Sequence, residues 1–242
     1  MKVAAIIQAR MGSTRLPGKV LKKVLNKTLL EYQIERVKRA KTIDEIIIAT
    51  TTKESDNPIV ELCEHLSVPY YRGSEEDVLS RYYESATQFN VDVIVRLTSD
   101  CPIIDPYIID KVVLYYLDNL PKYDYVSNSE YPRGMDTEVF STTIIEEVNK
   151  KARKEYEREH VTPYIYLNPE RYSLGKIVGS KDLNKYRLTV DTTEDFELIE
   201  NIITELYPQN KNFTINDILS LFRKKTELIH INKHIKQKNI IS

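Results

Sequence analysis

The twelve residues that follow the first apolar run carry the side chains with the clearest chemical meaning. This segment, from Gln8 to Lys19, reads Gln-Ala-Arg-Met-Gly-Ser-Thr-Arg-Leu-Pro-Gly-Lys and combines three cations, two hydroxyls and two of the six glycines in the chain. Arginine forks and a lysine charge neutralise phosphates, and glycine lets the backbone approach a ligand closely. The segment therefore predicts a loop that binds a polyphosphate, with a solvated basic loop as the plain alternative.

Two familiar phosphate-binding patterns do not describe this loop. A Walker loop has four residues between its glycines and a Ser or Thr after the Lys. Here five residues separate Gly12 from Gly18, and Val20 follows Lys19. The segment is also not the G-x-G-x-x-G turn of dinucleotide-binding folds.

Two aspartates are expected at the same place as this loop. Asp100 follows the strand-like segment 92–97, and Asp191 follows the strand-like segment 186–190. Ligands of open parallel sheets bind beyond the carboxyl ends of the strands, so the two carboxylates can share one site. The alternative for each is a cap on a turn or on a helix start.

Strand-like and helix-like segments alternate around these groups, which indicates a mostly parallel sheet with helices on both faces. Residues 2–8 are almost continuously apolar, as in strands that are buried on both faces. The expected strands are 2–8, 45–50, 68–71, 92–97 and 123–127, and the expected helices lie near 30–37, 57–66, 75–89 and 106–120.

The rest of the chain is expected to extend the same domain, which we take as residues 1–242. Residues 128–190 are less regular and are interpreted as a flap or a subunit contact. They contain helical stretches at 142–150 and 154–167 and strand-like stretches at 172–179 and 186–190; further helices are expected after 193 and at 214–225. From Lys224 onward the sequence is basic without periodicity, which predicts a loose tail rather than part of a site.

Composition excludes several classes of protein. Lys plus Arg is 35 and Asp plus Glu is 36, a net charge of −1, whereas a general nucleic-acid binder carries a large positive excess. No apolar stretch approaches the ~20 residues of a membrane span. Two cysteines cannot form a disulfide framework and fit a reducing compartment. With no targeting segment visible, we expect a cytoplasmic protein that binds neither nucleic acid nor membrane.

The loop from Gln8 to Lys19 resembles, residue by residue, the signature loop of the cytidylyltransferases that make CMP-activated sugars. The spore-coat polysaccharide SpsF type is the most similar, and the CMP-Kdo and CMP-acylneuraminate synthetases are more distant. The resemblance covers most of the chain. It implies a Rossmann-like three-layer α/β sandwich of the nucleotide-diphospho-sugar transferase type, with CTP as the nucleotide. The nucleotide contacts that it implies in the loop come from Gln8, Ala9, Arg10, Gly12, Ser13, Arg15 and Lys19.

The resemblance also gives the two aspartates a role, because these positions bind the divalent ion in the sugar-activating synthetases. Nucleotidyl transfer places negative charge on the α-phosphate and on the departing pyrophosphate, so cations must be fixed there beforehand. Magnesium is commonly held by one or two carboxylates together with phosphate oxygens and waters. We therefore expect Mg²⁺ on Asp100 and Asp191, and a catalytic set of Arg15, Lys19, Asp100 and Asp191. Glu194 and Asp195 are interpreted as first-turn acids favoured by the helix dipole.

Further polar residues are expected around the same cleft. Arg72, Gly73 and Asp77 resemble the base and ribose region of the family, although Asp77 also forms a capping-box pair with Ser74. Arg96 lies on a buried strand and needs a partner, either a phosphate or Asp100.

The acceptor side is expected from two runs, 133–140 and 158–163, that recur in SpsF-like chains. The residues assigned to it are Arg133, Asp136, Glu138 and His160. Glu138 and His160 are candidates for orienting the acceptor or taking its proton, and ordinary polar residues at a dimer contact are the alternative.

Together these features predict a magnesium-dependent cytidylyltransferase, acting as a homodimer in the synthesis of surface polysaccharide precursors. An oxygen of a small acceptor, either a sugar acid or a molecule that bears a phosphate or phosphonate, would attack the α-phosphorus of CTP and release pyrophosphate. One rival is a GT-A type glycosyltransferase, which typically needs an Asp-x-Asp pair, and no two aspartates here are two positions apart. The other rival is a non-catalytic nucleotide-binding protein.

Overall fold

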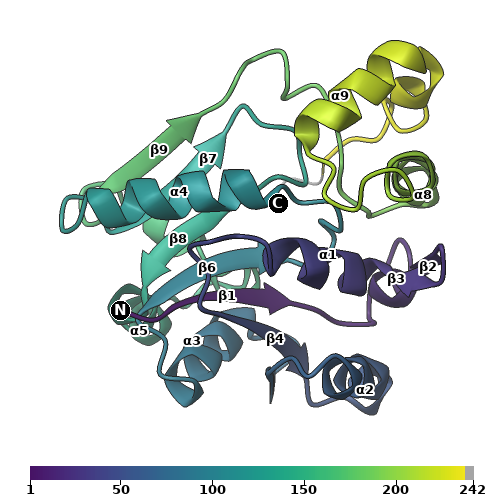
Figure 1. Ribbon diagram of the computed structural model, residues 1–242. Helices are drawn as coiled ribbons and strands as arrows, with labels where there is room; N and C mark the ends of the chain where they lie inside the picture. The colour runs from purple at the N-terminus through teal and green to yellow at the C-terminus, as the bar shows by residue number, and fades with distance from the viewer. Residues whose placement is uncertain (238–242) are drawn as a thin grey trace.

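The structure, a computed structural model, describes residues 1–237 and contains a seven-stranded sheet in the order β5-β4-β1-β6-β8-β7-β9 (Figure 1). β1 pairs in parallel with β4 and β6, and β8 runs antiparallel to both of its neighbours, β6 and β7. The strands are β1 (Val3–Gln8), β4 (Glu45–Thr51), β5 (Tyr70–Gly73), β6 (Val93–Thr98), β7 (Tyr125–Ser129), β8 (Glu138–Ser141) and β9 (Leu174–Val178). The expected mostly parallel sheet is confirmed.

Helices cover both faces of this sheet, which completes the expected three-layer sandwich; Figure 1 shows α1 and α4 above the sheet and α3 and α5 below it. One face carries α1 (Leu29–Val37), α2 (Asn57–His65), α4 (Pro106–Asp118), α8 (Thr193–Leu206) and α9 (Ile215–Lys224). The other carries α3 (Val78–Gln88), α5 (Thr142–Lys151), α6 (Glu155–His160) and α7 (Pro163–Tyr166).

The centre of the sheet explains why the first strand is apolar throughout. Side chains alternate between the two faces of a strand. Ala5 and Ile7 of β1 pack into the core under α1 and α4, whereas Ala4 and Ile6 pack into the core under α3 and α5. All four are fully buried. Since β1 ends at Gln8, the loop that follows begins at the carboxyl edge of the central strand.

Short elements follow the loop and were not predicted from the sequence. A 3-10 turn, η1 (Lys19–Leu21), leads into a hairpin of β2 (Lys23–Val24) and β3 (Lys27–Thr28). The two hairpin residues between these strands have positive φ, as in the turns that suit tight hairpins. A second 3-10 turn, η2 (Glu54–Asp56), precedes α2.

Three sequence predictions in the irregular region are wrong. The expected strand 186–190 does not pair with a strand of the sheet. Its backbone forms an isolated bridge with Arg133 and then donates from the Val190 N–H to the Asp100 carbonyl. Residues 138–141 form β8, although no strand was expected there. The expected helix 154–167 is divided into α6 and α7 because Val161 has φ +72°, a left-handed conformation that no helix can include.

The expected loose tail is also wrong for the described part of it. Residues after α9 form a 3-10 turn, η3 (Thr226–His230), and then pass close to residues 187–195. Leu228 and Asn232 are buried, at 6% and 3% exposure. The polar contacts of Asn232 and the packing of Leu228, Ile229 and Ile231 on the core hold this segment. These residues form no periodic helical face, so a search for helical periodicity missed the segment. The remaining tail residues, 238–242, lie outside the described part of the chain.

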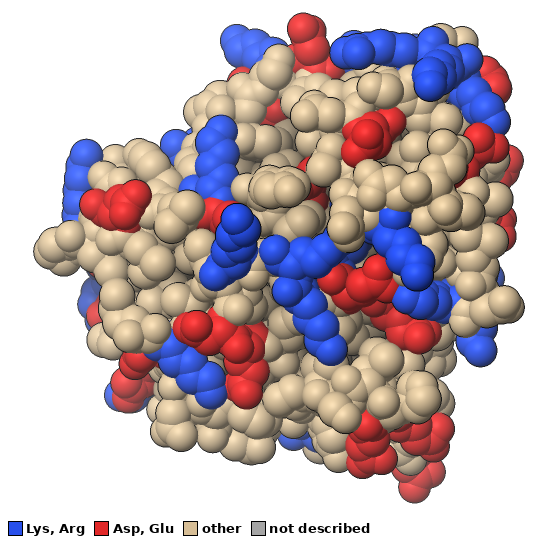
Figure 2. Space-filling model, viewed as in Figure 1, with Lys and Arg blue, Asp and Glu red and all other residues tan. Residues whose placement is uncertain are grey.

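Charge on the surface follows the balanced composition. Figure 2 shows Lys and Arg side chains interspersed with Asp and Glu on the face in view, without a continuous basic surface. Across residues 1–237, no helix has both the length and the apolar character needed to cross a membrane.

Candidate active cleft

A cleft of about 800 Å³ lies where β1 and β6 end. Its walls bring together most of the residues that were predicted from sequence, although they come from widely separated parts of the chain. The predicted residues that line it are Gln8, Ala9, Arg10, Ser13, Arg15, Lys19, Arg96, Asp100, Arg133, Asp136, Glu138, His160 and Asp191. The expectation that Asp100 and Asp191 face one cleft is confirmed.

The cationic loop is folded around the backbone of Met11. The Met11 N–H donates to a carboxylate oxygen of Asp56 at 2.7 Å, and the Met11 carbonyl accepts from the N–H groups of Ser13 and Gly18 at 2.8 and 3.0 Å. Gly18 has φ +66°, which glycine adopts without strain. Asp56 is only 1% exposed, and its other oxygen accepts from the Thr51 hydroxyl. Sequence analysis missed Asp56, because a buried carboxylate before a helix looks like any other cap.

Two of the three cations of the loop reach across the cleft to Asp191. The Lys19 ammonium donates to the Val190 carbonyl at 2.7 Å and to Asp191 Oδ1 at 2.8 Å, and Arg15 lies 3.0 Å from Asp191 Oδ2. Arg10 pairs instead with Glu75 at 3.3 Å. The loop is therefore tied to residues more than 170 positions later in the chain.

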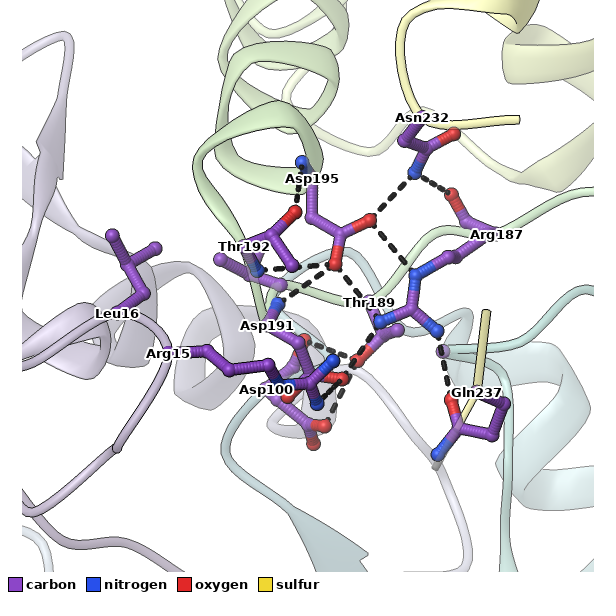
Figure 3. Close-up of polar contacts among 12 residues, drawn as sticks. Arg15, Leu16, Asp100, Arg187, Thr189, Asp191, Thr192, Asp195, Asn232 and Gln237 are labelled. Atoms are coloured by element: carbon purple, nitrogen blue, oxygen red, sulfur yellow. Dashed lines mark hydrogen bonds and ion pairs between the residues drawn. The ribbon is translucent and has the colours of Figure 1, made fainter. Parts of the chain in front are cut away.

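Asp191 is surrounded by positive charge, since Arg187 also donates to its Oδ2 at 2.7 Å (Figure 3). Burial alone would raise the pKa of this carboxyl. The charges of Lys19 and Arg15 and the hydrogen bonds outweigh burial and lower the pKa of Asp191 to about 2. Asp191 is thus a carboxylate throughout the physiological range.

Asp195 is more than the first-turn acid that the sequence predicted. It stands at the third position of a capping box with Thr192, and it accepts from the backbone N–H groups of Asp191 and Thr192 at 3.0 and 3.2 Å. It is also fully buried and paired with Arg187 at 2.8 Å. The start of α8 and the orientation of Asp191 are therefore fixed by the same side chain.

Asp100 is joined to the same segment. Its Oδ2 accepts from the Thr189 hydroxyl at 2.9 Å, and its carbonyl accepts from the Val190 N–H at 2.8 Å. The neighbouring Cys101 is 3% exposed, and burial raises the pKa of its thiol well above the usual value, so it has no thiolate to act as a nucleophile.

The donor chemistry of Asp100 and Asp191 fits magnesium. Carboxylate oxygens are the hard ligands that Mg²⁺ prefers, and one or two of them usually suffice when phosphate oxygens and waters complete the shell. Among residues 1–237, no group of three or more His, Cys, Asp or Glu side chains is placed to hold a metal ion.

The opposite wall is organised around Glu138. This carboxylate pairs with Arg96 and accepts from the hydroxyls of Tyr125 and Thr162. Arg96 also donates to the Gln8 side chain at 3.2 Å. Within the protein the partner of Arg96 is thus Glu138, because β6 and β8 are paired with Arg96 opposite Glu138. The expected pairing with Asp100 is wrong, and contact of Arg96 with a phosphate stays a prediction.

His160 lies on this wall at the end of α6, with about a third of its side chain exposed. Burial lowers the pKa of His160 below its ordinary value. The imidazole is therefore neutral at pH 7 and able to accept a proton. Arg133 and Asp136 form a half-exposed pair at 3.3 Å on the same side.

Four predicted nucleotide-binding residues do not line the cleft: Gly12, Arg72, Gly73 and Asp77. Arg72 donates to the carbonyls of Thr51 and Lys53 at 2.8 and 2.9 Å, so its fork is occupied by backbone. Asp77 is itself the N-cap of α3, where its side chain accepts from the Ser80 N–H at 2.9 Å, and it also pairs with Arg158. The considered capping box with Ser74 is therefore corrected, although Asp77 does have a structural role at the start of this helix.

Comparisons with known proteins agree with this geometry. The family model described as Cytidylyltransferase matches residues 4–232. The chain is 37% identical to the spore coat polysaccharide biosynthesis protein SpsF of Bacillus subtilis, over 81% of this chain and 83% of that protein. It is 42% identical to an uncharacterized protein of Methanocaldococcus jannaschii, over 99% and 98% of the two chains.

Solved structures give the same result. A cytidylyltransferase from Leptospira borgpetersenii superposes with a TM-score of 0.91 at 36% identity, covering 99% of this chain and all of the other. A CMP-2-keto-3-deoxy-manno-octonic acid synthetase in complex with CTP has a TM-score of 0.67 at 16% identity, covering 85% and 99%, and shares the fold.

The lowered pKa of Asp191 predicts how stability changes with pH. A carboxyl whose pKa is lower in the folded state stabilises the protein above its unfolded pKa of about 4, and this contribution disappears as the pH falls toward the folded pKa of about 2. The stability difference between wild type and Asp191→Asn should therefore shrink by about 2 kcal/mol between pH 5 and pH 2. Urea unfolding at several pH values measures it, and a constant difference would contradict the ion-paired state of Asp191.

Proposed function

The chain belongs to the cytidylyltransferase family, and from this premise we propose that it transfers CMP from CTP to a small acceptor with release of pyrophosphate. The acceptor that we propose is a sugar acid or a molecule bearing a phosphate or phosphonate, in the synthesis of surface polysaccharide precursors. The observation that carries this proposal is the convergence of Arg15 and Lys19 on Asp191 in a cleft that Asp100 also lines. The role of the SpsF relative in spore coat polysaccharide biosynthesis supports the class of product.

In this proposal the loop after β1 binds the triphosphate. Arg15 and Lys19 are at the cleft surface, with 29% and 13% of their side chains exposed, and Asp191 compensates their charge before substrate arrives. When substrate binds, phosphate oxygens would replace Asp191 as the anionic partners of Arg15 and Lys19. Neither cation would then be buried without an anionic partner. Arg10, which also lines the cleft and is paired with Glu75 at 3.3 Å, is a third phosphate ligand in the same loop.

We propose Mg²⁺ as the cofactor, with Asp100 and Asp191 as the side chains that would hold it. When bound, the ion would neutralise negative charge on the α-phosphate and on the leaving pyrophosphate. Asp191 is suited to this task because its lowered pKa keeps it ionised, and Asp100 is oriented by Thr189.

On the acceptor side, His160 is the residue that we propose to take the proton from the attacking oxygen. Its lowered pKa leaves the imidazole neutral, which a general base requires. Glu138 is better suited to hold Arg96 against this wall, since the guanidinium and two hydroxyls already occupy its oxygens. Arg133 and Asp136 are proposed acceptor contacts at the rim.

We further propose that residues 1–242 act as one domain in the cytoplasm. Both cysteines are buried as free thiols, which suits a reducing compartment. Neither nucleic acid nor a membrane is a partner in this proposal.

The proposal is tested by pyrophosphate release with Mg²⁺, CTP and a panel of sugar acids, polyol phosphates and phosphonates. At least one acceptor should support turnover with CTP, and Asp100→Asn should lower kcat about 10²-fold or more, as for other groups that stabilise transition-state charge. Asp182→Asn, an exposed aspartate outside the cleft, is the matched control and should keep full activity. An unchanged rate in Asp100→Asn removes this residue from the metal site. Tight nucleotide binding without turnover favours the non-catalytic rival, and turnover of a finished nucleotide sugar favours the glycosyltransferase.

Lys19→Ala separates triphosphate binding from base and sugar binding. Loss of a charged hydrogen bond costs about 1.5–3 kcal/mol, so the Kd for CTP should rise about 10- to 100-fold while that for CMP changes little. Lys23→Ala, an exposed lysine on β2, is the control and should bind both nucleotides like wild type. Calorimetric titration measures both constants. Equal losses for CTP and CMP would show that Lys19 contacts the nucleoside instead.

We also propose that residues 128–190 carry a homodimer interface. β9 is an edge strand of the sheet, and Leu174 and Val178 on it are 36% and 57% exposed, with Leu167 at 42% nearby in sequence. Light scattering at micromolar concentration should give twice the chain mass, and Val178→Asp should shift it toward the monomer. A monomeric wild type would rule out this interface.

A further inference from the structure

We propose that Arg187 is a positioning residue for Asp191, and that residues 226–237 belong to the catalytic unit because they hold Arg187 in place. This inference rests on the proposed function, in which Asp191 carries catalysis. Neither Arg187 nor the segment after α9 was predicted from the sequence to take part in the site.

Arg187 is saturated by contacts within the protein (Figure 3). Its Nη2 donates to Asp191 at 2.7 Å and to Asp195 at 2.9 Å, and its Nε donates to the second oxygen of Asp195 at 2.8 Å. Its Nη1 donates to Gln237 at 2.7 Å. Every guanidinium nitrogen thus has a protein acceptor, and the side chain is 10% exposed. Arg187 does not line the cleft, so it acts on substrate through Asp191.

The partners of Arg187 are themselves fixed from the side away from the cleft. Asn232 is 3% exposed, and its amide donates to Asp195 at 2.8 Å and to the Arg187 carbonyl at 3.0 Å. One residue of the segment after α9 therefore holds both the backbone of Arg187 and the carboxylate that Arg187 grips. Gln237 completes the arrangement and lines both the cleft and a smaller cavity of about 280 Å³, which Arg187 and Asn232 also line.

This geometry gives the three cations around Asp191 different roles. Arg15 and Lys19 come from the loop and face the cleft, so an incoming triphosphate competes with Asp191 for both of them. Arg187 is held by Asp195 and Gln237. It therefore stays in contact with Asp191 when Arg15 and Lys19 move to bind phosphate. Asp191 then keeps one charged partner and its orientation while its remaining oxygen lone pairs face the substrate.

The experiment compares Arg187→Lys with wild type in turnover and in binding. Lysine keeps the charge but cannot form the two-pronged contact to Asp191 and Asp195. We expect kcat to fall about 10- to 100-fold, as for a misplaced catalytic group, and the KM for CTP in Mg²⁺ to rise by no more than about tenfold. Calorimetry of CTP binding in EDTA and in Mg²⁺ adds a readout that needs no turnover. The affinity for CTP in EDTA should be unchanged. The gain from Mg²⁺, which is the factor by which Mg²⁺ increases the affinity for CTP, should fall about tenfold, in line with the loss in kcat.

Asn232→Ala tests the same idea farther from the cleft and guards against a misfolded Arg187→Lys. It should lower kcat and the gain from Mg²⁺ in the same direction, by about 3- to 10-fold. The matched control is Asn201→Ala, which removes an amide that donates to the Glu197 carbonyl of its own helix, at 2.8 Å, and not to a residue around Arg187. It should behave like wild type.

The outcomes separate the two hypotheses. Wild-type kcat and Mg²⁺ gain in both variants, even with lowered thermal stability, would overturn the positioning role and leave Arg187 as a structural residue. A raised KM with unchanged kcat would overturn it too, because Arg187 would then bind nucleotide directly. A wild type that binds no CTP, or gains nothing from Mg²⁺, would instead overturn the proposed function, together with the premise of this inference.

Discussion

The organisation of the cleft depends on one buried electrostatic arrangement, the carboxylate of Asp191 among Lys19, Arg15 and Arg187. Two of these cations come from the loop after the first strand, and the third lies four residues before Asp191 itself. Because a carboxylate buried without partners is costly, each group constrains the position of the others. The pairing therefore joins the beginning of the chain to a segment more than 170 residues later and gives the cleft a defined shape.

The sheet makes this arrangement possible. β1 lies between β4 and β6, so the loop that leaves β1 and the turn that leaves β6 emerge side by side at one edge. The Thr189 and Val190 contacts to Asp100 then attach the late segment to that edge. Asp56, from the turn before α2, fixes the loop by its backbone and leaves the cationic side chains free to face the cleft. The hydrophobic core thus positions the backbone around the cleft, and buried polar residues orient the side chains that face it.

The two walls of the cleft differ in how they are prepared for chemistry. On the side of the loop, positive charge is already collected and temporarily balanced by carboxylates, which suits a highly charged substrate. On the opposite wall, Arg96 and Glu138 neutralise each other, and His160 is uncharged. A cytidylyltransferase needs such a division, since one reactant brings a triphosphate and the other must approach as a nucleophile.

Sequence alone determined the alternating α/β order, the buried first strand, the cationic loop after it and the position of Asp100 beyond the end of β6, because these depend on local periodicity and on residue types that lie next to one another. Only the tertiary structure decided that Arg96 pairs with Glu138, that Arg72 and Asp77 serve backbone and helix rather than the cleft, and that Asn232 and Gln237 reach Arg187. These contacts join residues far apart in the chain through single hydrogen bonds and ion pairs. Such contacts leave no periodic trace in the sequence, so the packing of the whole chain was needed to reveal them.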